Sequence, residues 1–504
     1  MRPGVVFVLD DAIEVPSDIH SMTGIGRFGD LIHRRRRLHE WTDAAAAAAG
    51  FTERLRLEDT SARRRLAERL EASTSPTRFV FATSDVVGLA DRALERFLHK
   101  LAYADRDVAT MPEGSGPGSC LAGLSKEALR RLLLAPTRRD RQAVLADETH
   151  PIEPIEAGPD LRCIADSGIF NRFLSGSFIA RSFNAVHSEG RTVLKTSTDP
   201  DKLRREHDYW YLLPPNLQRF VVQPFDFETT PQGGCYRMER LNVPDLAVLW
   251  IHGRGALSDE ELGHALDAVF DWFAQRPVRR VPAAEAEAAA RALYIDKVRQ
   301  RRDRLLATEV GRKLDAMIAH TTGWGGVSAL IDRYETLLEA SWKDGIGDQI
   351  AVMHGDLCFS NILYDKRSRL MKLVDPRGAA EANEIWGDPY YDVAKLSHSV
   401  LGGYDFINNG LFELTVDDDL GLTLRLHEGG QREAGNLFRQ RVEAAGFDVG
   451  RMRLYEASLF LSMLPLHAED PRKLAGFVVR AGTILDEVAS ADTRPRSVIS
   501  RMLG

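Results

Sequence analysis

The segment 351–378, AVMHGDLCFSNILYDKRSRLMKLVDPRG, holds the residue types and spacing that point most directly to chemistry. His354-Gly-Asp356 is followed by Asn361, five residues after the aspartate, and then by Asp375 after a short apolar run. Phosphoryl transfer from a nucleotide needs one carboxylate to orient the attacking hydroxyl and accept its proton, with an amide and a second carboxylate to hold magnesium. Magnesium prefers hard oxygen ligands and keeps several waters, so one or two side chains are enough. The spacing predicts a phosphotransfer site, with Asp375 arriving from a strand end to face the loop.

The sequence of segment 351–378 closely resembles the catalytic and metal loops of aminoglycoside phosphotransferases and choline kinase-like enzymes. These are small-molecule kinases with the protein-kinase-like fold. Their His-Gly-Asp-x-x-x-x-Asn signature and a later aspartate stand where protein kinases have His-Arg-Asp and Asp-Phe-Gly. The resemblance implies that Asp356 is the catalytic base, that Asn361 and Asp375 are Mg²⁺ ligands, and that His354 supports the loop. The text GDPYYDVA that follows resembles the family's next segment, in which an aspartate at the place of Asp392 buttresses the catalytic loop.

A kinase of this type also needs a lysine on a strand, which holds the nucleotide phosphates, and a glutamate on the next helix. Thr192-Val-Leu-Lys195 predicts a strand ending in the lysine, and Glu206 lies eleven residues further on in a predicted helix. Lys195 is therefore expected to hold the phosphates of ATP, paired with Glu206, and the two residues together orient the nucleotide. Glu189 and Asp208 remain alternatives to Glu206.

Two further segments are expected to complete the nucleotide site. Ser175, Gly176 and Ser177 form a small-residue turn between two predicted strands, where backbone N–H groups can approach phosphates. Glu239 and Leu241 follow a predicted strand and are expected in the hinge whose backbone meets adenine. An ordinary hairpin turn and a plain connecting strand are the alternatives.

The acceptor is a small hydroxyl-bearing molecule by resemblance, and the segment after Asp375 looks most like kinases associated with bacterial capsule or surface-sugar genes. A sugar or an amino-alcohol is the expected class. The guanidinium fork of Arg377 suits anionic groups, although a salt bridge within the domain is equally consistent. A cationic aminoglycoside would favour an acidic rim instead. The candidate acceptor-contacting residues are Arg377, Glu381, Asp388, Tyr390, Tyr404 and Asp405.

The elements that must position these residues follow from apolar periodicity. Short strands are predicted at 169–173, 178–183, 192–194, 220–222 and 235–240, with a helix over 199–213. Helices are then predicted at 258–273, 283–307, 325–341, 390–401, 430–446, 451–464 and 472–490. The fold expected is a two-lobed, protein-kinase-like α+β domain, with a small β-rich lobe over 160–245 and a large helical lobe over 246–495.

The first 155 residues alternate strands and helices and predict a separate α/β domain. Its expected elements are strands at 5–9 and 79–82, a helix over 38–49 and a long loop over 112–125. Gly24-Ile-Gly-Arg-Phe-Gly29, followed by four arginines, loosely resembles the opening of sugar-nucleotidyltransferases, in which Asp85 would be a metal-binding acid. An active transferase, a degenerate one and an unrelated α/β domain are all left open.

The composition limits the remaining function classes. The 504 residues carry 66 Lys plus Arg against 73 Asp plus Glu, a formal charge of −7, which argues against a general nucleic-acid binder. No segment approaches the roughly 18 apolar residues of a membrane span, and the first residues lack the apolar stretch of a secretory signal. The four cysteines have no metal or redox spacing. A cytoplasmic protein without membrane insertion is expected, and a homo-oligomer is left open.

These features together predict an ATP- and Mg²⁺-dependent kinase of a small molecule. The alternatives are a protein kinase, a bifunctional kinase and nucleotidyltransferase that activates a sugar, and a pseudokinase scaffold that binds nucleotide without turnover. Two features count against a protein kinase. The motif at 354–356 is His-Gly-Asp instead of His-Arg-Asp, and no Ala-Pro-Glu-like element follows Asp375.

Overall fold

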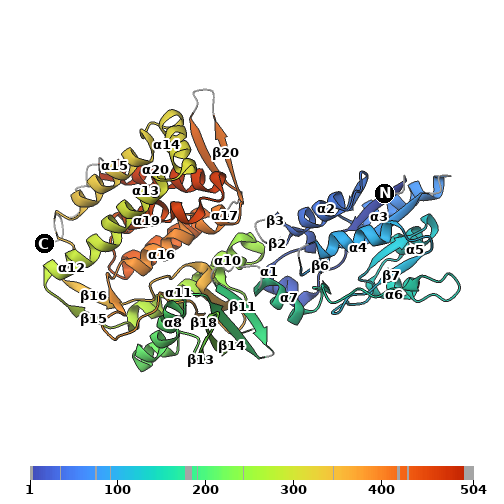
Figure 1. The fold of residues 1–504 in the computed structure, drawn as a ribbon, viewed down its shortest axis with the longest axis horizontal. Coiled ribbons are helices and arrows are strands. Elements are labelled where there is room, and N and C mark those ends of the chain that lie inside the picture. The colour runs from blue at the N-terminus through green and yellow to red at the C-terminus, as the bar shows by residue number, and fades with distance from the viewer. Residues whose placement is uncertain are drawn as a thin grey trace. The chain divides into compact units, whose positions relative to one another are not determined.

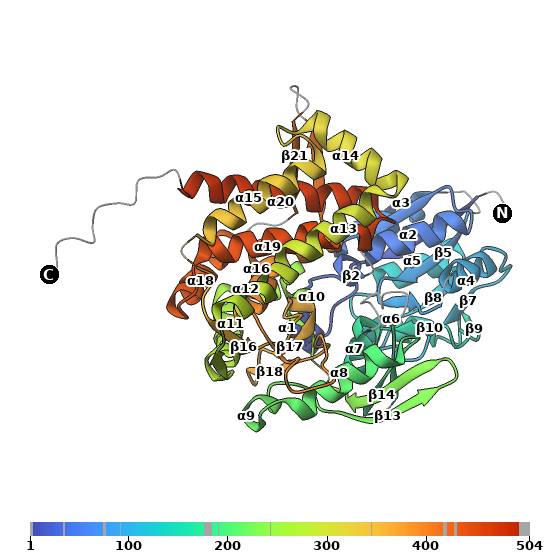
Figure 2. The same ribbon diagram turned by 60° about the vertical axis from the view of Figure 1, so that its left-hand side comes forward.

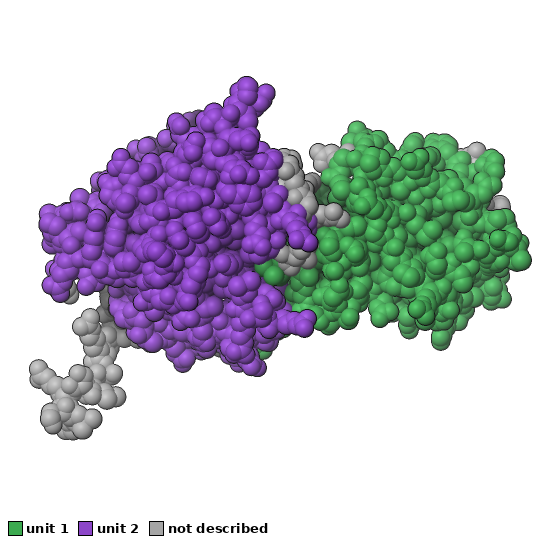
Figure 3. Space-filling view, turned by 90° about the horizontal axis from the view of Figure 1, so that it is seen from below, with its two compact units in different colours: residues 1–179, 242–244, 252–257 green, residues 180–241, 245–251, 258–504 purple. Residues whose placement is uncertain are grey.

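The computed structural model divides into two compact units (Figure 3). The first unit comprises Met1–Ile179 with Asn242–Pro244 and His252–Leu257, and the second comprises Ala180–Leu241, Asp245–Ile251 and Ser258–Gly504. The residues that the structure describes are 4–33, 36–73, 77–90, 92–175, 184–189, 191–241, 243–343, 345–416, 421–427 and 431–492.

The first unit is built on a six-stranded mixed sheet in the order β4-β1-β5-β8-β7-β9 (Figure 1). The central strand β1 runs parallel to both β4 and β5, whereas β8 is antiparallel to β5 and β7. The strands of this sheet are β1 (Val5–Asp10), β4 (Arg54–Leu57), β5 (Arg78–Thr83), β7 (Val108–Thr110), β8 (Leu121–Leu124) and β9 (Glu153–Pro154). Two short pairs accompany it, formed by β2 (Ile32–His33) with β3 (Arg36–Arg37) and by β6 (Val86–Gly88) with β10 (Leu161–Cys163).

Helices cover both faces of this sheet, because successive residues of β1 point to opposite sides. Val6 and Val8 join one apolar cluster with residues of α3 and α5, and Phe7 and Leu9 join the other with residues of α2 and α4. The helices of the first unit are α1 (Ser17–Thr23), α2 (Leu38–Ala48), α3 (Thr60–Ala72), α4 (Ala93–Ala102), α5 (Lys126–Leu134), α6 (Arg138–Leu145) and α7 (Ser167–Ser175). The α/β character predicted for this part of the chain is therefore present.

Two features of the first unit differ from the expectation. The loop predicted over 112–125 contains β8, a fully buried strand between β5 and β7, whose apolar residues follow a glycine-rich stretch without a turn signal of their own. The unit also extends past the expected boundary at 155, because β10 pairs with β6 and thereby holds the following chain against the sheet.

Residues 169–173, predicted as a strand, lie in the helix α7. Asp166 accepts a hydrogen bond from the N–H of Ile169 at 2.9 Å, as a helix-capping aspartate does. Ile169, Phe170, Phe173 and Leu174 are buried, and their spacing puts them on one face of a helix. The strand prediction was wrong because a short apolar run does not by itself distinguish the two periods.

The second unit begins with a four-stranded antiparallel sheet in the order β11-β12-β14-β13. These strands are β11 (Asn184–Glu189), β12 (Thr192–Ser197), β13 (Pro224–Thr230) and β14 (Gly233–Glu239), with α8 (Pro200–Leu212) and α9 (Pro215–Gln218) between β12 and β13. The strands expected at 192–194 and 235–240 are thus present. Residues 220–222 supply only an isolated bridge, Val221 to Leu373, rather than a strand of the sheet. The segment 178–183, also predicted as a strand, lies outside the described residues.

The rest of the second unit is mostly helical (Figures 1 and 2). The helices are α10 (Leu246–Ile251), α11 (Asp259–Gln275), α12 (Ala283–Arg291), α13 (Lys297–Leu306), α14 (Glu309–Thr321), α15 (Gly326–Ser341), α16 (Tyr391–Val400), α17 (Tyr404–Asn408), α18 (Gln431–Ala444), α19 (Val449–Met463) and α20 (Pro471–Asp492). The short strands are β15 (Val278–Arg280), β16 (Gln349–Val352), β17 (Ile362–Asp365), β18 (Leu370–Leu373), β19 (Trp386–Gly387), β20 (Phe412–Val416) and β21 (Leu422–Leu426).

One apolar core joins α13, α14, α15, α19 and α20. At its centre the rings of Tyr294 and Tyr455 stack with their centroids 3.8 Å apart. A sheet-rich region followed by a helical one is therefore present, and the assignment of the two as kinase-like lobes stays a prediction. Within the described residues, none of the helices has the length and apolar character needed to cross a membrane.

Candidate active site

The loop that follows β16 is fixed by its backbone to the first turn of α16. The buried carboxylate of Asp392 accepts hydrogen bonds from the N–H of His354 at 2.7 Å and from the N–H of Gly355 at 2.8 Å. Gly355 has φ +82°, and a Cβ at this position would lie 2.5 Å from the Cβ of Arg377. A glycine is therefore required where the loop turns toward Asp356.

Asp356 and Asn361 face each other within this loop. The amide Nδ2 of Asn361 donates to the backbone oxygen of Asp356 at 2.8 Å and to its Oδ2 at 3.2 Å. The amide is thereby oriented with its oxygen turned away from Asp356 and free to meet a cation. The side chain of Asp356 is 40% exposed, so a substrate can reach the carboxylate.

The β17–β18 hairpin positions Asp375 close to Asn361 of the catalytic loop. Ile362 pairs with Leu373 across the hairpin, and the N–H of Val374 donates to the backbone oxygen of Asn361 at 3.0 Å. Asp375 is the next residue, has φ +56°, and exposes 45% of its side chain. The hairpin therefore places both expected metal ligands at one end of the same pair of strands.

Lys195 connects this carboxylate to the sheet of the second unit. Its ammonium lies 2.9 Å from Oδ1 of Asp375, 180 positions away in the sequence, and 2.5 Å from Oε2 of Glu206 on α8. Burial by itself would lower the pKa of Lys195, but Asp375, Tyr236 and Glu206 raise it overall, so the ammonium stays charged. Of the alternatives to Glu206, Asp208 pairs with the neighbouring His207 instead.

Asn361 and Asp375 fit a magnesium ion by the chemistry of their donors. They offer one amide oxygen and one carboxylate, and Mg²⁺ typically takes one or two such side chains and fills its other positions with water and phosphate oxygens. No group of three or more His, Cys, Asp or Glu suited to a metal occurs among the described residues. This donor set therefore fits a shared nucleotide–metal site better than an all-protein cage.

The remaining residues predicted to bind nucleotide are less closely defined. Ser175 is the last residue of α7, so the predicted turn follows a helix rather than a strand, and Gly176 and Ser177 lie outside the described residues. Glu239 ends β14, and Leu241 follows it on the way to α10. The assignment of these residues to phosphate and adenine binding stays a prediction.

His354 is fully buried, and its ring meets that of Tyr209 edge-on, with centroids 6.4 Å apart. Burial lowers the pKa of its imidazole. A neutral, buried ring in the loop is consistent with the supporting role expected for it.

Lys395 is a site residue that the sequence reasoning missed. Its ammonium lies 2.8 Å from Oδ1 of Asp356. Burial opposes the charge, but Asp356 and Tyr391 raise the pKa of Lys395. A signal was available, because Lys395 follows Asp392 by three residues in a predicted helix, and residues at that spacing share a face.

Most of the residues proposed to contact the acceptor serve other contacts. Asp388 is buried and accepts from the hydroxyl of Tyr294 at 3.0 Å, and Asp405 is also buried. The ring of Tyr404 stacks on that of His398, with centroids 4.5 Å apart. The hydroxyl of Tyr390 accepts from the N–H of Asp448, and Glu381 is exposed. Arg377 differs from these residues in that its side chain runs directly past Gly355 of the catalytic loop.

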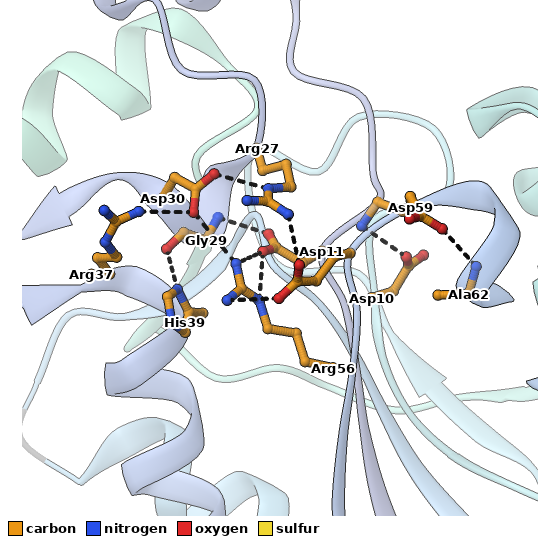
Figure 4. Close-up of polar contacts among 12 residues, drawn as sticks. Asp10, Asp11, Arg27, Gly29, Asp30, Arg37, His39, Arg56, Asp59 and Ala62 are labelled. Carbon is orange, nitrogen blue, oxygen red and sulfur yellow. Dashed lines mark hydrogen bonds and ion pairs between the residues drawn. The ribbon is translucent and has the colours of Figure 1, made fainter. Parts of the chain in front are cut away.

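The glycine-rich motif of the first unit is tied to an acidic and basic cluster (Figure 4). Asp11 accepts from the N–H of Gly29 at 2.8 Å and from Nε of Arg56 at 2.9 Å. Asp30 accepts from Nε of Arg27 at 2.8 Å, so the arginine of the motif already has an acidic partner.

Asp85 is likewise engaged within the first unit. The buried Asp85 accepts from the hydroxyl of Ser119 at 2.6 Å and from Nη1 of Arg138 at 3.1 Å. Of the arginine run, residues 34 and 35 lie outside the described part of the chain, and Arg36 and Arg37 are exposed in β3. The nucleotidyltransferase resemblance stays a prediction.

Residues 171–407 match the model of the phosphotransferase enzyme family. The matched range contains Lys195, Glu206, Asp356, Asn361 and Asp375. This part of the chain therefore carries the sequence pattern of that phosphotransferase family. No match to the chain is found among curated proteins.

Solved structures similar to the chain include two aminoglycoside phosphotransferases and a choline kinase. A thermostable mutant of APH(4)-Ia is 17% identical over 63% of this chain and 98% of its own, with a TM-score of 0.35. APH(3'')-Id from Streptomyces rimosus is 17% identical over 60% and 98%, with a TM-score of 0.32. The choline kinase of Cryptosporidium parvum is 11% identical over 65% and 94%, with a TM-score of 0.28.

Proposed function

We propose that the protein transfers the γ-phosphoryl group of ATP to a hydroxyl of a small molecule, with Mg²⁺ as cofactor. The observation that carries this proposal is the ion-paired group of Lys195, Glu206 and Asp375, built from positions up to 180 residues apart and placed beside Asp356 and Asn361 through the β17–β18 hairpin. A buried lysine between two carboxylates, next to a carboxylate–amide loop, is the set of groups that phosphoryl transfer uses.

In this mechanism, Asp356 accepts the proton of the acceptor hydroxyl as its oxygen forms a bond to the γ-phosphorus. The bond between that phosphorus and the oxygen bridging it to the β-phosphate breaks, and ADP leaves with the bridging oxygen. Lys195 orients the phosphates and neutralises their charge, while Glu206 holds Lys195 in place. Asn361 and Asp375 would hold Mg²⁺, which supplies further charge neutralisation when bound. The reaction depends on positioning and electrostatics and forms no covalent enzyme intermediate.

The test is Mg²⁺-dependent release of ADP by the full chain, with a panel of monosaccharides, sugar acids, sugar phosphates, amino sugars, choline-like amines and aminoglycosides. At least one acceptor is expected to raise turnover above the background hydrolysis. The variant Asp356→Asn should lower that stimulated rate by about 10²- to 10⁴-fold, the typical contribution of a general base.

Asp332→Asn is the matched control, because that aspartate is 73% exposed on α15 and outside the site. Thermal stabilisation by ATP without stimulation by any acceptor would instead support a nucleotide-binding scaffold. Stimulation that persists unchanged in Asp356→Asn would overturn the assignment of the base.

A further inference from the structure

Three cationic side chains lie near Tyr391 and the catalytic loop, and we call Lys297, Arg377 and Lys395 the cationic rim. Lys395 of α16 pairs with Asp356 at 2.8 Å. Lys297, the first residue of α13, donates to the hydroxyl of Tyr391 at 3.3 Å, and its ammonium lies 5.7 Å from the centroid of that ring. The three cations come from three separate segments, so their convergence is a property of the tertiary structure.

The rim carries more positive charge than its surroundings neutralise. Within the part of the chain that the structure describes, Lys395 has Asp356 as its carboxylate partner, whereas neither Lys297 nor Arg377 forms an ion pair with a carboxylate. Of the three cations, Lys395 is therefore the one that an ion pair within the described residues neutralises. An anion brought to this place would gain favourable charge-assisted contacts.

The pKa of the buried Tyr391 hydroxyl responds to the positive charge of the rim. Burial tends to raise the pKa of a phenol, but Lys395, Lys297 and Arg377 lower it below its usual value at Tyr391, against an opposing effect of Asp356. At the Tyr391 hydroxyl, the effect of the three cations on the pKa therefore outweighs that of Asp356.

Two of the three acids named as candidate acceptor contacts are buried and make other hydrogen bonds. Asp388 is buried and accepts from the hydroxyl of Tyr294, and Asp405 is buried next to Ser399. Among the candidates named for the acceptor, Arg377 has its side chain against the catalytic loop. The chain also departs from regular α-helix directly before Lys297, in a π-helical segment, Ala292–Asp296, of a type that occurs frequently at functional sites.

We propose that the acceptor is an anion, namely a hydroxyl-bearing molecule with a phosphate or carboxylate group close to the hydroxyl that is phosphorylated. Lys297 and Arg377 bind the anionic group, and Lys395 positions Asp356 against the hydroxyl. This inference rests on the proposed kinase function and narrows its substrate class. It separates the protein from kinases whose acceptors are polycations.

The first experiment compares acceptors that share a hexose ring and differ in one neutral or charged substituent: a neutral hexose, its phosphate ester, its uronic acid and its amino sugar. The phosphate ester or the uronic acid should have a kcat/KM at least about 10-fold above that of the neutral sugar, since each charge-assisted contact contributes about one power of ten. The ester and the acid distinguish phosphate from carboxylate as the recognised group. Preference for the neutral or the amino sugar would overturn the anionic assignment while leaving the kinase function intact.

The second experiment asks whether the rim recognises the acceptor rather than ATP. Lys297→Gln and Arg377→Gln should each raise the KM for the anionic acceptor by about 10-fold, with the KM for ATP unchanged. Lys313→Gln on α14, whose ammonium is 75% exposed beside Glu309, is the matched control. A rise in the KM for ATP instead would assign these cations to the nucleotide phosphates and overturn the proposal.

A binding measurement keeps the inference testable without turnover. Inorganic phosphate is titrated against the full chain saturated with Mg²⁺ and a non-hydrolysable ATP analogue, so that the nucleotide site is filled. Phosphate should bind, and Lys297→Gln and Arg377→Gln should weaken it by about 10-fold while Lys313→Gln does not. Phosphate binding that is absent, or that these two variants leave unchanged, would overturn the anion site, whatever acceptor the kinase assay identifies.

Discussion

Lys195 is buried between Glu206 and Asp375, and both carboxylates matter to its state. An isolated ammonium at this depth would lose its proton, because removing a charge from water is costly. The two carboxylates and Tyr236 keep its pKa above the usual value, so a positive charge is ready where phosphate is expected. Burial raises the pKa of Glu206, although Lys195 opposes the shift. The lysine is therefore held in place before any nucleotide arrives, which favours rapid neutralisation of phosphate charge.

We predict that Lys195→Met lowers kcat/KM for ATP by about 10²- to 10³-fold, because it removes a preorganised charge from the reacting phosphates. Glu206→Gln should have a smaller effect, since it keeps a hydrogen-bond acceptor for the lysine. Lys313→Met on α14 is the control, because that side chain is 75% exposed and pairs with Glu309 rather than with a residue of the site. Steady-state kinetics of the three variants provide the measurement, and equal activities would contradict the assigned role.

At the scale of elements, one face of α16 supports the whole catalytic loop. Asp392, Lys395 and Ser399 are spaced by three and four residues and therefore lie along one stripe of the helix. Asp392 binds the backbone before the catalytic aspartate, Lys395 binds Asp356 itself, and the hydroxyl of Ser399 accepts from the N–H of Phe359 at 3.1 Å. The position of the base thus depends on the packing of a single helix.

Asp392→Asn should reduce both stability and turnover. The asparagine amide offers one carbonyl oxygen to two N–H donors and turns an NH₂ group toward one of them. We expect a loss of about 1–3 kcal/mol in the free energy of unfolding, together with a fall in kcat that exceeds the change in KM. Denaturant titration and kinetics measure the two effects. Ser399→Ala, which removes one neutral acceptor for the loop together with the hydrogen bond to Asp405, should lower kcat less, and the reverse order in kcat would contradict this account of the loop.

Two acids are buried in the second unit, Asp245 directly before α10 and Asp405 in α17. Burial raises the pKa of Asp405 to about 7, with a hydrogen bond from Ser399 opposing the shift, and it raises the pKa of Asp245 as well. The folded chain therefore holds a proton on Asp405 that the unfolded chain releases above a pKa of about 3.8. The stability that depends on this proton is present at low pH and is lost as the pH rises from about 4 to about 7.

Asp405→Asn keeps the side chain neutral at every pH and should remove this part of the pH dependence. The variant is expected to melt at a higher temperature than the natural protein at pH 8, with the difference shrinking toward pH 5. Thermal melts at the two pH values measure it, with Asp332→Asn as an exposed control. Parallel pH curves for the variant and the natural protein would show that Asp405 is ionised in the fold.

At the scale of the whole molecule, each compact unit has a core of its own. The first unit buries apolar clusters on both faces of its sheet, and the second buries the core of α13, α14, α15, α19 and α20. The first unit also includes the short segment His252–Leu257, which the chain reaches after the first sheet of the second unit. Gly24 lies directly against this segment, and the ring of His252 accepts from the N–H of Ile32 at 3.0 Å.

Gly24→Ala should destabilise the first unit. A Cβ at Gly24 would lie 2.1 Å from the carbonyl carbon of Gly255, and the residue has φ +67°. The left-handed conformation alone costs a non-glycine residue about 1–2 kcal/mol, and the steric contact adds to it. Calorimetry of the full chain measures the loss. Gly26→Ala is the control, because its Cβ would meet nothing within 4 Å, and equal effects of the two changes would contradict the close approach.

The sequence by itself determined the local parts of the candidate site. The spacing from His354 through Asp356 and Asn361 to Asp375 predicted a loop and a strand end, and the structure has both, because hairpin geometry is a short-range property. The capping box at Ser258 and the regular apolar periods predicted α11 and most later helices within a few residues. The strand that carries Lys195 and the helix that carries Glu206 were recognisable for the same reason.

Only the tertiary structure decided which distant charges meet. Lys195 reaches Asp375 across 180 positions, and the cationic rim gathers Lys297, Arg377 and Lys395 from three segments near Tyr391 and the catalytic loop. Contacts between charged residues so far apart in the chain cannot be predicted from a single sequence, because they depend on how helices and sheets pack. The prediction of a strand at 169–173 was wrong for a related reason. A short apolar run can form either a helix or a strand, and the capping residue and the surrounding packing decide which. The proposed chemistry could thus be anticipated from neighbouring residues, whereas the charge that we propose for the acceptor depends on the packing.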